Sequence, residues 1–156
     1  MKLFTDGSVN PQLKVGYGAY LFVTDENTVL QSSVKTKRFE QTSSTKLELQ
    51  TLLWALSDIL ALGYSNPKVM VYTDSQNIIG LPRRHERFEK NDYMTKANKR
   101  IANYTLYMEF YRVTACLECE FIKVKGHKKS YQKDEIDRIF TFVDRASRLA
   151  LREDKN

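Results

Sequence analysis

Two segments of the chain end in the same short pattern, an aromatic residue followed by Thr, Asp and a small residue: Phe4-Thr-Asp-Gly7 and Tyr72-Thr-Asp-Ser75. Each follows an apolar run typical of a buried strand, so Asp6 and Asp74 are expected at the carboxyl ends of neighbouring strands, where open α/β sheets bind ligands. Two adjacent carboxylates repel each other unless a cation lies between them. Either Asp alone could be a turn residue, but the matched pair favours a cation site.

Further carboxylates lie on two predicted helices. Glu48 is one turn into the first helix, where it could complete a capping box with Thr45 or lean toward the strand ends. Asp137 and Asp144 flank the apolar stripe of the last helix, two turns or about 10 Å apart, so they cannot hold the same ion. Asp137 near the helix start could instead interact with the helix dipole.

The hydrophobic pattern predicts the element order β-β-β-α-β-α-α-β-α. Strands are expected at 2–8, 16–23, 29–34, 69–72 and 118–124, with a hairpin turn at 25–27. One helix should start within 42–45 and be closed by Gly63, and a short one should span 76–81 before Pro82 stops it. The last two helices are expected at 96–113 and 134–152.

The 156 residues predict a single domain, residues 1–156, with a formal charge of +6. No 18-residue apolar run and no signal-peptide pattern are visible, which predicts a cytoplasmic protein without a membrane partner. Cys116 and Cys119 are interpreted as ordinary thiols, because no second pair of zinc ligands has suitable spacing. Basic residues interleave with aromatic ones after Arg83, which is typical of a nucleic-acid groove.

Five motifs, in this order, resemble the type-one ribonuclease H family nearly end to end. They are Phe4-Thr-Asp-Gly-Ser8, Thr45-Lys-Leu-Glu-Leu49, Tyr72-Thr-Asp-Ser-Gln76, Val124-Lys-Gly-His127 and Val143-Asp-Arg-Ala-Ser147. The resemblance implies an α/β ribonuclease H-like fold, a mixed five-stranded sheet with three antiparallel strands, then parallel strands, and helices on both faces. It also implies a basic protrusion, roughly 83–100, that grips the substrate.

The resemblance further implies a metal-dependent endonuclease that hydrolyses the RNA strand of RNA·DNA hybrids as a monomer. Two Mg²⁺ ions, with Mn²⁺ as an alternative, would activate water and stabilise the leaving oxygen. Their expected ligands are Asp6, Glu48, Asp74 and Asp144, and Asp144 is preferred to Asp137 because its surroundings match the last motif. His127 would assist proton transfer or product release.

Substrate contacts are expected at nine positions, namely Gly7, Ser8, Ser44, Thr45, Gln76, Arg83, Arg84, Lys99 and Arg100. One departure concerns Ser44-Thr45, because many members carry two asparagines there, which makes strict hybrid specificity less secure than catalysis. A same-fold nuclease for another duplex and a hybrid-binding module without turnover are therefore kept as alternatives.

Overall fold

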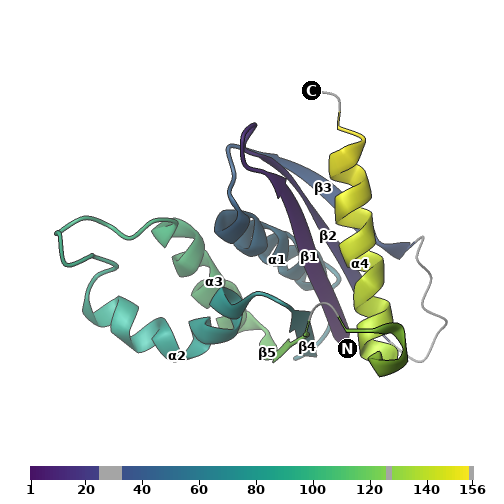
Figure 1. Ribbon diagram of the computed structural model, residues 1–156. Coiled ribbons are helices and arrows are strands. Elements are labelled where there is room, and N and C mark those ends of the chain that lie inside the picture. Colours follow the sequence, from purple (N-terminus) through teal and green to yellow (C-terminus); the bar gives the residue numbers. More distant parts are fainter. Residues whose placement is uncertain (25–32, 126–127, 155–156) are drawn as a thin grey trace.

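A computed structural model of the protein describes residues 1–24, 33–125 and 128–154. Its centre is one mixed sheet with the strand order β3-β2-β1-β4-β5 (Figure 1). The strands are β1 (Lys2–Asn10), β2 (Val15–Val23), β3 (Lys35–Glu40), β4 (Lys68–Thr73) and β5 (Glu118–Lys123). The first three pair antiparallel, whereas β4 is parallel to β1 and β5 is parallel to β4. The predicted mixed sheet is confirmed.

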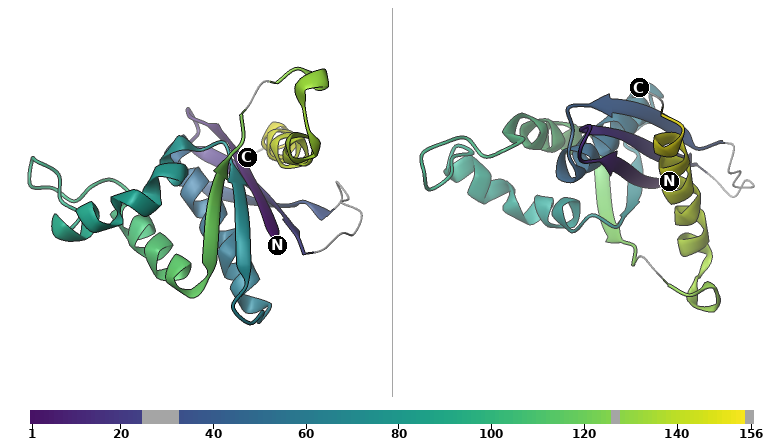
Figure 2. Two further views of the ribbon diagram at one scale, coloured as in Figure 1. Left: turned by 90° about the horizontal axis from the view of Figure 1, so that it is seen from below. Right: turned by 45° about the horizontal axis from the view of Figure 1, so that its top comes forward.

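Helices cover both faces of this sheet (Figure 2). They are α1 (Ser44–Ala61), α2 (Gln76–Lys90), α3 (Tyr104–Cys116) and α4 (Glu135–Arg152), with a short 3-10 helix (Ser130–Gln132) before α4. Consecutive residues of β1 show the division, because Leu3 packs in the core with α1 and Phe4 in the core with α4. Burial on both faces explains why the central strands are continuous apolar runs.

Two strands differ from the prediction. β1 continues past residue 8 to Asn10, because β2 pairs with it along its whole length. The third strand occupies 35–40 instead of 29–34, and residues 25–32, including the predicted turn, lie outside the described residues. β3 is an edge strand whose sequence, KTKRFE, is mostly polar and exposed, so it lacks the apolar run that the prediction looked for.

Pro82 lies inside α2 and does not end it, so the predicted short helix 76–81 is wrong. A proline within a helix removes one backbone donor. Here side chains donate to nearby carbonyls: Arg84 Nη2 to Asn77 O at 2.6 Å, and Tyr111 Oη to Leu81 O at 2.7 Å. These bonds hold carbonyl groups that precede Pro82 in the chain, and α2 runs on to Lys90.

The second correction concerns α3, which starts at Tyr104 and not at residue 96. Before it, Tyr93, Asn98 and Asn103 have φ values of 56°, 63° and 63°, in the left-handed region that interrupts a right-handed helix. The irregular segment 91–103 is held by an antiparallel bridge between Met94 and Arg100. Together with α2 and the start of α3 it extends away from the sheet (Figure 1).

The last helix matches its predicted bounds closely. Asp134 is its N-cap, and Ile139, Phe140 and Val143 are buried against the sheet.

In the part of the chain that the structure describes, no helix is both long enough and apolar enough to cross a membrane.

Candidate active site

The parallel pairing of β1 with β4 brings Asp6 and Asp74 to the same level of the sheet. The last paired residues are Phe4 and Tyr72, whose rings stack with centroids 4.9 Å apart. Each aspartate follows two residues later, Asp6 still within β1 and Asp74 just after β4. Asp6 therefore lies within a strand and not at its end, but the two carboxylates are close enough that the charge of Asp74 raises the pKa of Asp6.

Asp144 approaches the same carboxylate from α4. This helix packs across β1, where the hydroxyl oxygens of Ser8 and Ser147 are 3.0 Å apart. Burial, together with the charge of Asp74 and the side chain of Asp144, raises the pKa of Asp6 to about 8, although a hydrogen bond from the Gly7 backbone acts in the opposite direction. Residues from β1, β4 and α4 therefore form one cluster of negative charge.

Glu48 is held at this cluster by Ser75. The hydroxyl of Ser75 donates to Glu48 Oε2 at 2.6 Å, and its oxygen accepts from the backbone N–H of Ile78 at 3.2 Å as the N-cap of α2. Burial raises the pKa of Glu48, and the charge of Asp74 also raises it. Ser43, not Thr45, caps α1, so the predicted capping box between Thr45 and Glu48 is wrong, and Glu48 points to the strand ends.

A divalent cation suits the donor chemistry of this cluster. Carboxylate oxygens are the ligands that Mg²⁺ and Mn²⁺ prefer, and the half-buried Asp6 lies among other acids that raise its pKa. In the described residues, however, no three His, Cys, Asp or Glu side chains are grouped closely enough to hold a metal ion. Glu48 bonds to Ser75, and Asp144 Oδ1 accepts from Arg148 Nε at 3.0 Å. The carboxylates therefore match the ligand preference of a divalent ion. The bond from Ser75 to Glu48 and the bond from Arg148 to Asp144 would have to rearrange for these carboxylates to bind one.

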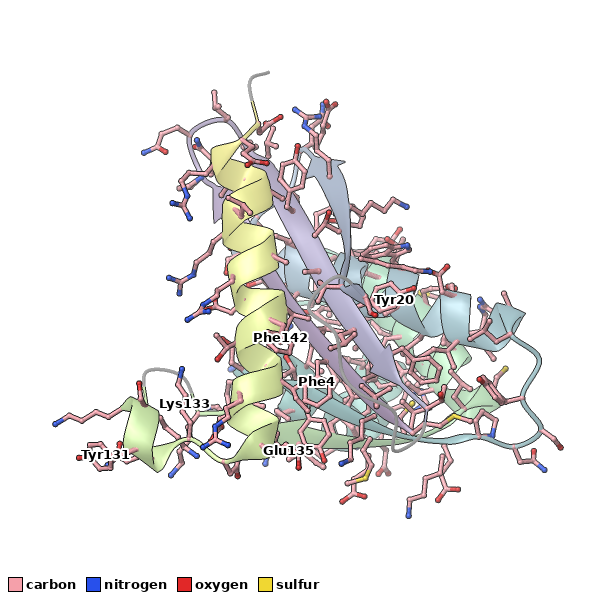
Figure 3. The ribbon with its side chains drawn as sticks, turned by 90° about the vertical axis from the view of Figure 1, so that its right-hand side faces the viewer. Phe4, Tyr20, Tyr131, Lys133, Glu135 and Phe142 are labelled. Carbon is pink, nitrogen blue, oxygen red and sulfur yellow. The ribbon has the colours of Figure 1, made fainter. Side chains whose placement is uncertain are left out.

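A cavity of about 100 Å³ adjoins the cluster, and basic side chains form one wall of it. Its lining includes Asp74 and Asp144 together with Lys125, Lys128, Lys133 and Arg148. Lys133 lies beside α4, where its Nζ is 3.3 Å from Thr141 Oγ1, and Tyr131 projects outward from the same segment (Figure 3). Carboxylates that could bind metal ions therefore lie beside lysine and arginine side chains that could bind phosphates.

Asp137 is used within the protein fold. Its carboxylate accepts from Lys128 Nζ at 2.9 Å and from the backbone N–H of Asp134 at 3.1 Å, which completes a capping box for α4. These bonds, led by that with Lys128, lower the pKa of Asp137. Only 6% of the residue is exposed, and its carboxylate lies at the start of α4, where it can interact with the helix dipole as expected. Asp144, not Asp137, is the acid that lies beside Asp6.

Of the predicted substrate contacts, Ser44, Thr45 and Gln76 are exposed at the starts of α1 and α2, next to the carboxylates. Lys123 Nζ donates to Gln76 Oε1 at 2.7 Å. Ser44 and Thr45 lie one turn before Glu48 on α1. All three side chains could reach a strand bound at the carboxylates.

Gly7 and Ser8 have structural reasons for their identities. A Cβ at Gly7 would lie 2.9 Å from Leu47 Cδ2, too close for a side chain unless the Leu47 side chain shifts. Ser8 contacts Ser147 on α4 and so helps to seat the helix that carries Asp144.

The four basic residues predicted to grip the substrate differ in their contacts. Arg84 is half-buried and donates to Gly80 O, Asn77 O and Asn77 Oδ1, so its guanidinium serves the fold. Arg100 donates to Asp92 O and pairs with its carboxylate. Arg83 and Lys99 are exposed on the extended part of the molecule.

Several residues at this site were recognised or missed for clear reasons. His127 lies outside the described residues, so its role stays a prediction, although Lys125 and Lys128 on either side of it line the cavity. Ser75 and Arg148 were missed as functional candidates. Ser75 could have been found because it follows Asp74 directly, and Arg148 because it lies one helical turn after Asp144.

Comparisons with known proteins place this fold in a family. The family model for RNase H matches residues 1–142. Ribonuclease H of Moorella thermoacetica is 27% identical over 142 residues, which cover 88% of this chain and 86% of the relative. The structure of LC11-RNase H1 in complex with an RNA/DNA hybrid has a TM-score of 0.61 and 18% identity, covering 96% of this chain and 98% of that one.

A second solved structure, the PFV RNase H domain in solution, has a TM-score of 0.70 and 14% identity, covering 95% of this chain and 92% of that one. At these identities the solved structures establish the fold, whereas the family model, which matches most of the chain, establishes the family. The chain therefore belongs to the RNase H family and is a hydrolase of the ribonuclease H type.

Proposed function

We propose that this protein is a metal-dependent endonuclease that hydrolyses the RNA strand of RNA·DNA hybrids. The observation that carries the proposal is the convergence of Asp74 and Asp144 on the half-buried Asp6, whose pKa is raised to about 8 by burial and by these two acids together. Acids gathered in this way repel one another unless a cation lies between them, and such clusters occur at functional sites. Two similar proteins support an RNA·DNA hybrid as the substrate: the relative is named Ribonuclease H, and LC11-RNase H1 was solved in complex with an RNA/DNA hybrid.

Asp6, Glu48, Asp74 and Asp144 are proposed as the ligands of two divalent ions, Mg²⁺ or alternatively Mn²⁺. When bound, these ions supply positive charge to the phosphate and lower the pKa of the attacking water. Without them four acids would repel an anionic backbone, which argues against a binding module without turnover. The expected monomeric state, cytoplasmic location and single domain stay predictions.

The protein's own groups would orient the substrate. Ser75 fixes the Glu48 carboxylate through a 2.6 Å hydrogen bond. Lys125, Lys128 and Lys133 line the adjoining cavity and would hold phosphates of the strand that passes the acids. His127 is proposed to assist proton transfer or product release.

Hybrid selection would depend on contacts with the 2′-hydroxyl, the group that distinguishes RNA from DNA along the backbone. Ser44, Thr45 and Gln76 offer hydroxyl and amide groups at the rim of the carboxylates. Arg83 and Lys99 would hold the other strand by its phosphates.

A cleavage assay with matched duplexes tests this proposal. The RNA strand of a hybrid, a duplex RNA and a duplex DNA of the same sequence would be labelled and incubated with Mg²⁺ or with EDTA. We expect only the RNA of the hybrid to be cut, and only with Mg²⁺. Equal cutting of duplex RNA would support the broader duplex nuclease, and hybrid binding without any cutting would overturn the proposed catalysis.

A further inference from the structure

The solvent-facing side of α4 carries positive charge along most of its length. Arg138, Arg145, Arg148 and Arg152 are all exposed, and the one acid between the first and the last is Asp144. Figure 3 shows nitrogen-tipped side chains gathered along this helix on the side away from the sheet. Like charges at helical spacing repel, and a solvated helix usually mixes both signs. The arrangement therefore indicates an anionic partner.

A groove of about 600 Å³ runs over this side of α4. Arg145, Arg148, Leu149 and Arg152 line it, together with Asp144. Asp144 and Arg148 also line the cavity beside Asp74. Because Asp144 and Arg148 line both, the groove adjoins that cavity, and from Asp144 it follows the helix toward its C-terminal end, with Ala146 and Val34 also in its lining.

The arginines of the groove form few ion pairs with the rest of the protein. Among residues 1–24, 33–125 and 128–154, no acid forms an ion pair with Arg145 or Arg152. Arg148 Nε is 3.0 Å from Asp144 Oδ1, and 61% of its side chain is exposed. These guanidinium groups are therefore available to phosphates, for which their planar donor arrangement is well suited.

The groove fits a single strand better than a duplex or a membrane surface. Leu149, 50% exposed, lies among the arginines and offers an apolar surface to a sugar or a base, which a duplex would keep stacked inside. The apolar side of α4 is buried in the core through Ile139, Phe140 and Val143, so the helix has no apolar face to insert into lipid.

We propose that this groove, lined by Arg145, Arg148, Leu149 and Arg152, binds an unpaired extension of the RNA strand that passes the carboxylates. The inference rests on the proposed function, because that function places the RNA strand at Asp144. It makes α4 a second nucleic-acid contact, and Figure 1 shows α4 and α2 on opposite sides of the strands. Hybrids flanked by single-stranded RNA would then be the preferred substrates.

Binding by fluorescence anisotropy in EDTA tests the inference without turnover. The ligands are a blunt hybrid and two hybrids whose RNA strand continues as single-stranded uridines, at the 5′ or the 3′ end. We expect one extension to tighten binding by roughly fivefold to tenfold. In the double variant Arg145→Ala/Arg152→Ala the ratio of extended to blunt affinity should fall to about one. The additional salt dependence caused by the extension should fall by about 1.4, or 0.7 per phosphate.

The matched control is Lys2→Ala/Lys68→Ala, which removes the same charge from exposed residues at the amino ends of β1 and β4. This variant should keep the wild-type ratio, and thermal melting should show that both variants fold. Three results would each overturn the inference. The wild-type protein could bind blunt and extended hybrids with equal affinity, the arginine variant could keep the wild-type ratio of extended to blunt affinity, or the control variant could lose that ratio to the same extent. Failure of the proposed function looks different, because the wild-type protein would then leave even the blunt hybrid uncut in Mg²⁺.

Discussion

Replacing Asp137 and Asp144 separately by Asn should affect two different properties of the protein. Asp137 lies in the capping box of α4 and pairs with Lys128 at 2.9 Å, whereas Asp144 lies beside Asp6. We expect Asp137→Asn to lower thermal stability with turnover nearly unchanged. Asp144→Asn should reduce turnover in Mg²⁺ on the order of a hundredfold or more, with little loss of stability.

The size of the stability loss follows from the contacts of Asp137. An Asn keeps one oxygen for the backbone N–H of Asp134, now at 3.1 Å, but loses the negative charge at the start of α4. Loss of that charge costs about 0.3–1 kcal/mol, and a weakened cap costs about 0.5–1 kcal/mol. The free energy of unfolding should therefore fall by about 1–2 kcal/mol, which lowers the melting temperature by roughly 2–8 °C.

The pH dependence supplies an internal check. The pKa of Asp137 is lowered from its ordinary value of 3.8, chiefly by Lys128, so its carboxylate stabilises the fold above that pH. This contribution is lost as pH falls through the lower folded-state pKa. Melting curves of wild type and Asp137→Asn should therefore converge in acid. Loss of turnover in Asp137→Asn with unchanged melting would refute the reasoning and move the catalytic acid to the first turn of α4.

Three further predictions concern other parts of the site. Asp6→Asn should raise the melting temperature of the metal-free protein at pH 8 but not below pH 3.8. The pKa of Asp6 is raised from 3.8 to about 8 in the folded protein, so ionisation of this side chain favours the unfolded state increasingly as pH rises between these values. Equal melting of the two proteins at pH 8 would contradict the charge cluster. Ser75→Ala should cost about 1 kcal/mol as a lost cap of α2. Because the Ser75 hydrogen bond lowers the pKa of Glu48, the acidic limb of the pH–rate profile should also move to higher pH, and an unmoved limb would separate Ser75 from catalysis. Arg83→Ala/Lys99→Ala should reduce the salt slope of hybrid binding by about 1.8, or 0.9 per phosphate, in a titration over salt, and an unchanged slope would exclude these phosphate contacts.

The central sheet and the outer helices could be predicted because their patterns are strong. Apolar runs ending in Thr-Asp identified β1 and β4, and the stripe with Ile139 and Val143 identified α4. The same reasoning failed for β3, whose polar edge sequence carries no apolar pattern. It also failed for α2, because a rule that ends a helix at proline takes no account of contacts with another helix, such as the bond from Tyr111 to Leu81 O.

The site was predictable to the level of residue types but not of contacts. Matched motifs brought Asp6 and Asp74 together correctly, since parallel register follows from the sheet. Asp137 and Asp144 share one face of α4, two turns apart, so the choice between them depends on which turn of the helix crosses β1, and that is a property of packing. The sequence also could not predict that Arg84 bonds within α2 and not to a substrate, because its acceptors there include backbone carbonyls.

Cleavage of an RNA·DNA hybrid by Asp74→Asn, measured beside its affinity in EDTA, tests the central claim most directly. Asp74 follows a buried strand and is itself exposed, so the substitution removes a charge at the proposed metal site with little change in packing. The account predicts that turnover in Mg²⁺ falls to the background of the assay while melting and metal-free hybrid affinity stay at least as high as in the wild type. Turnover close to that of the wild type would contradict the carboxylate cluster as the catalytic centre.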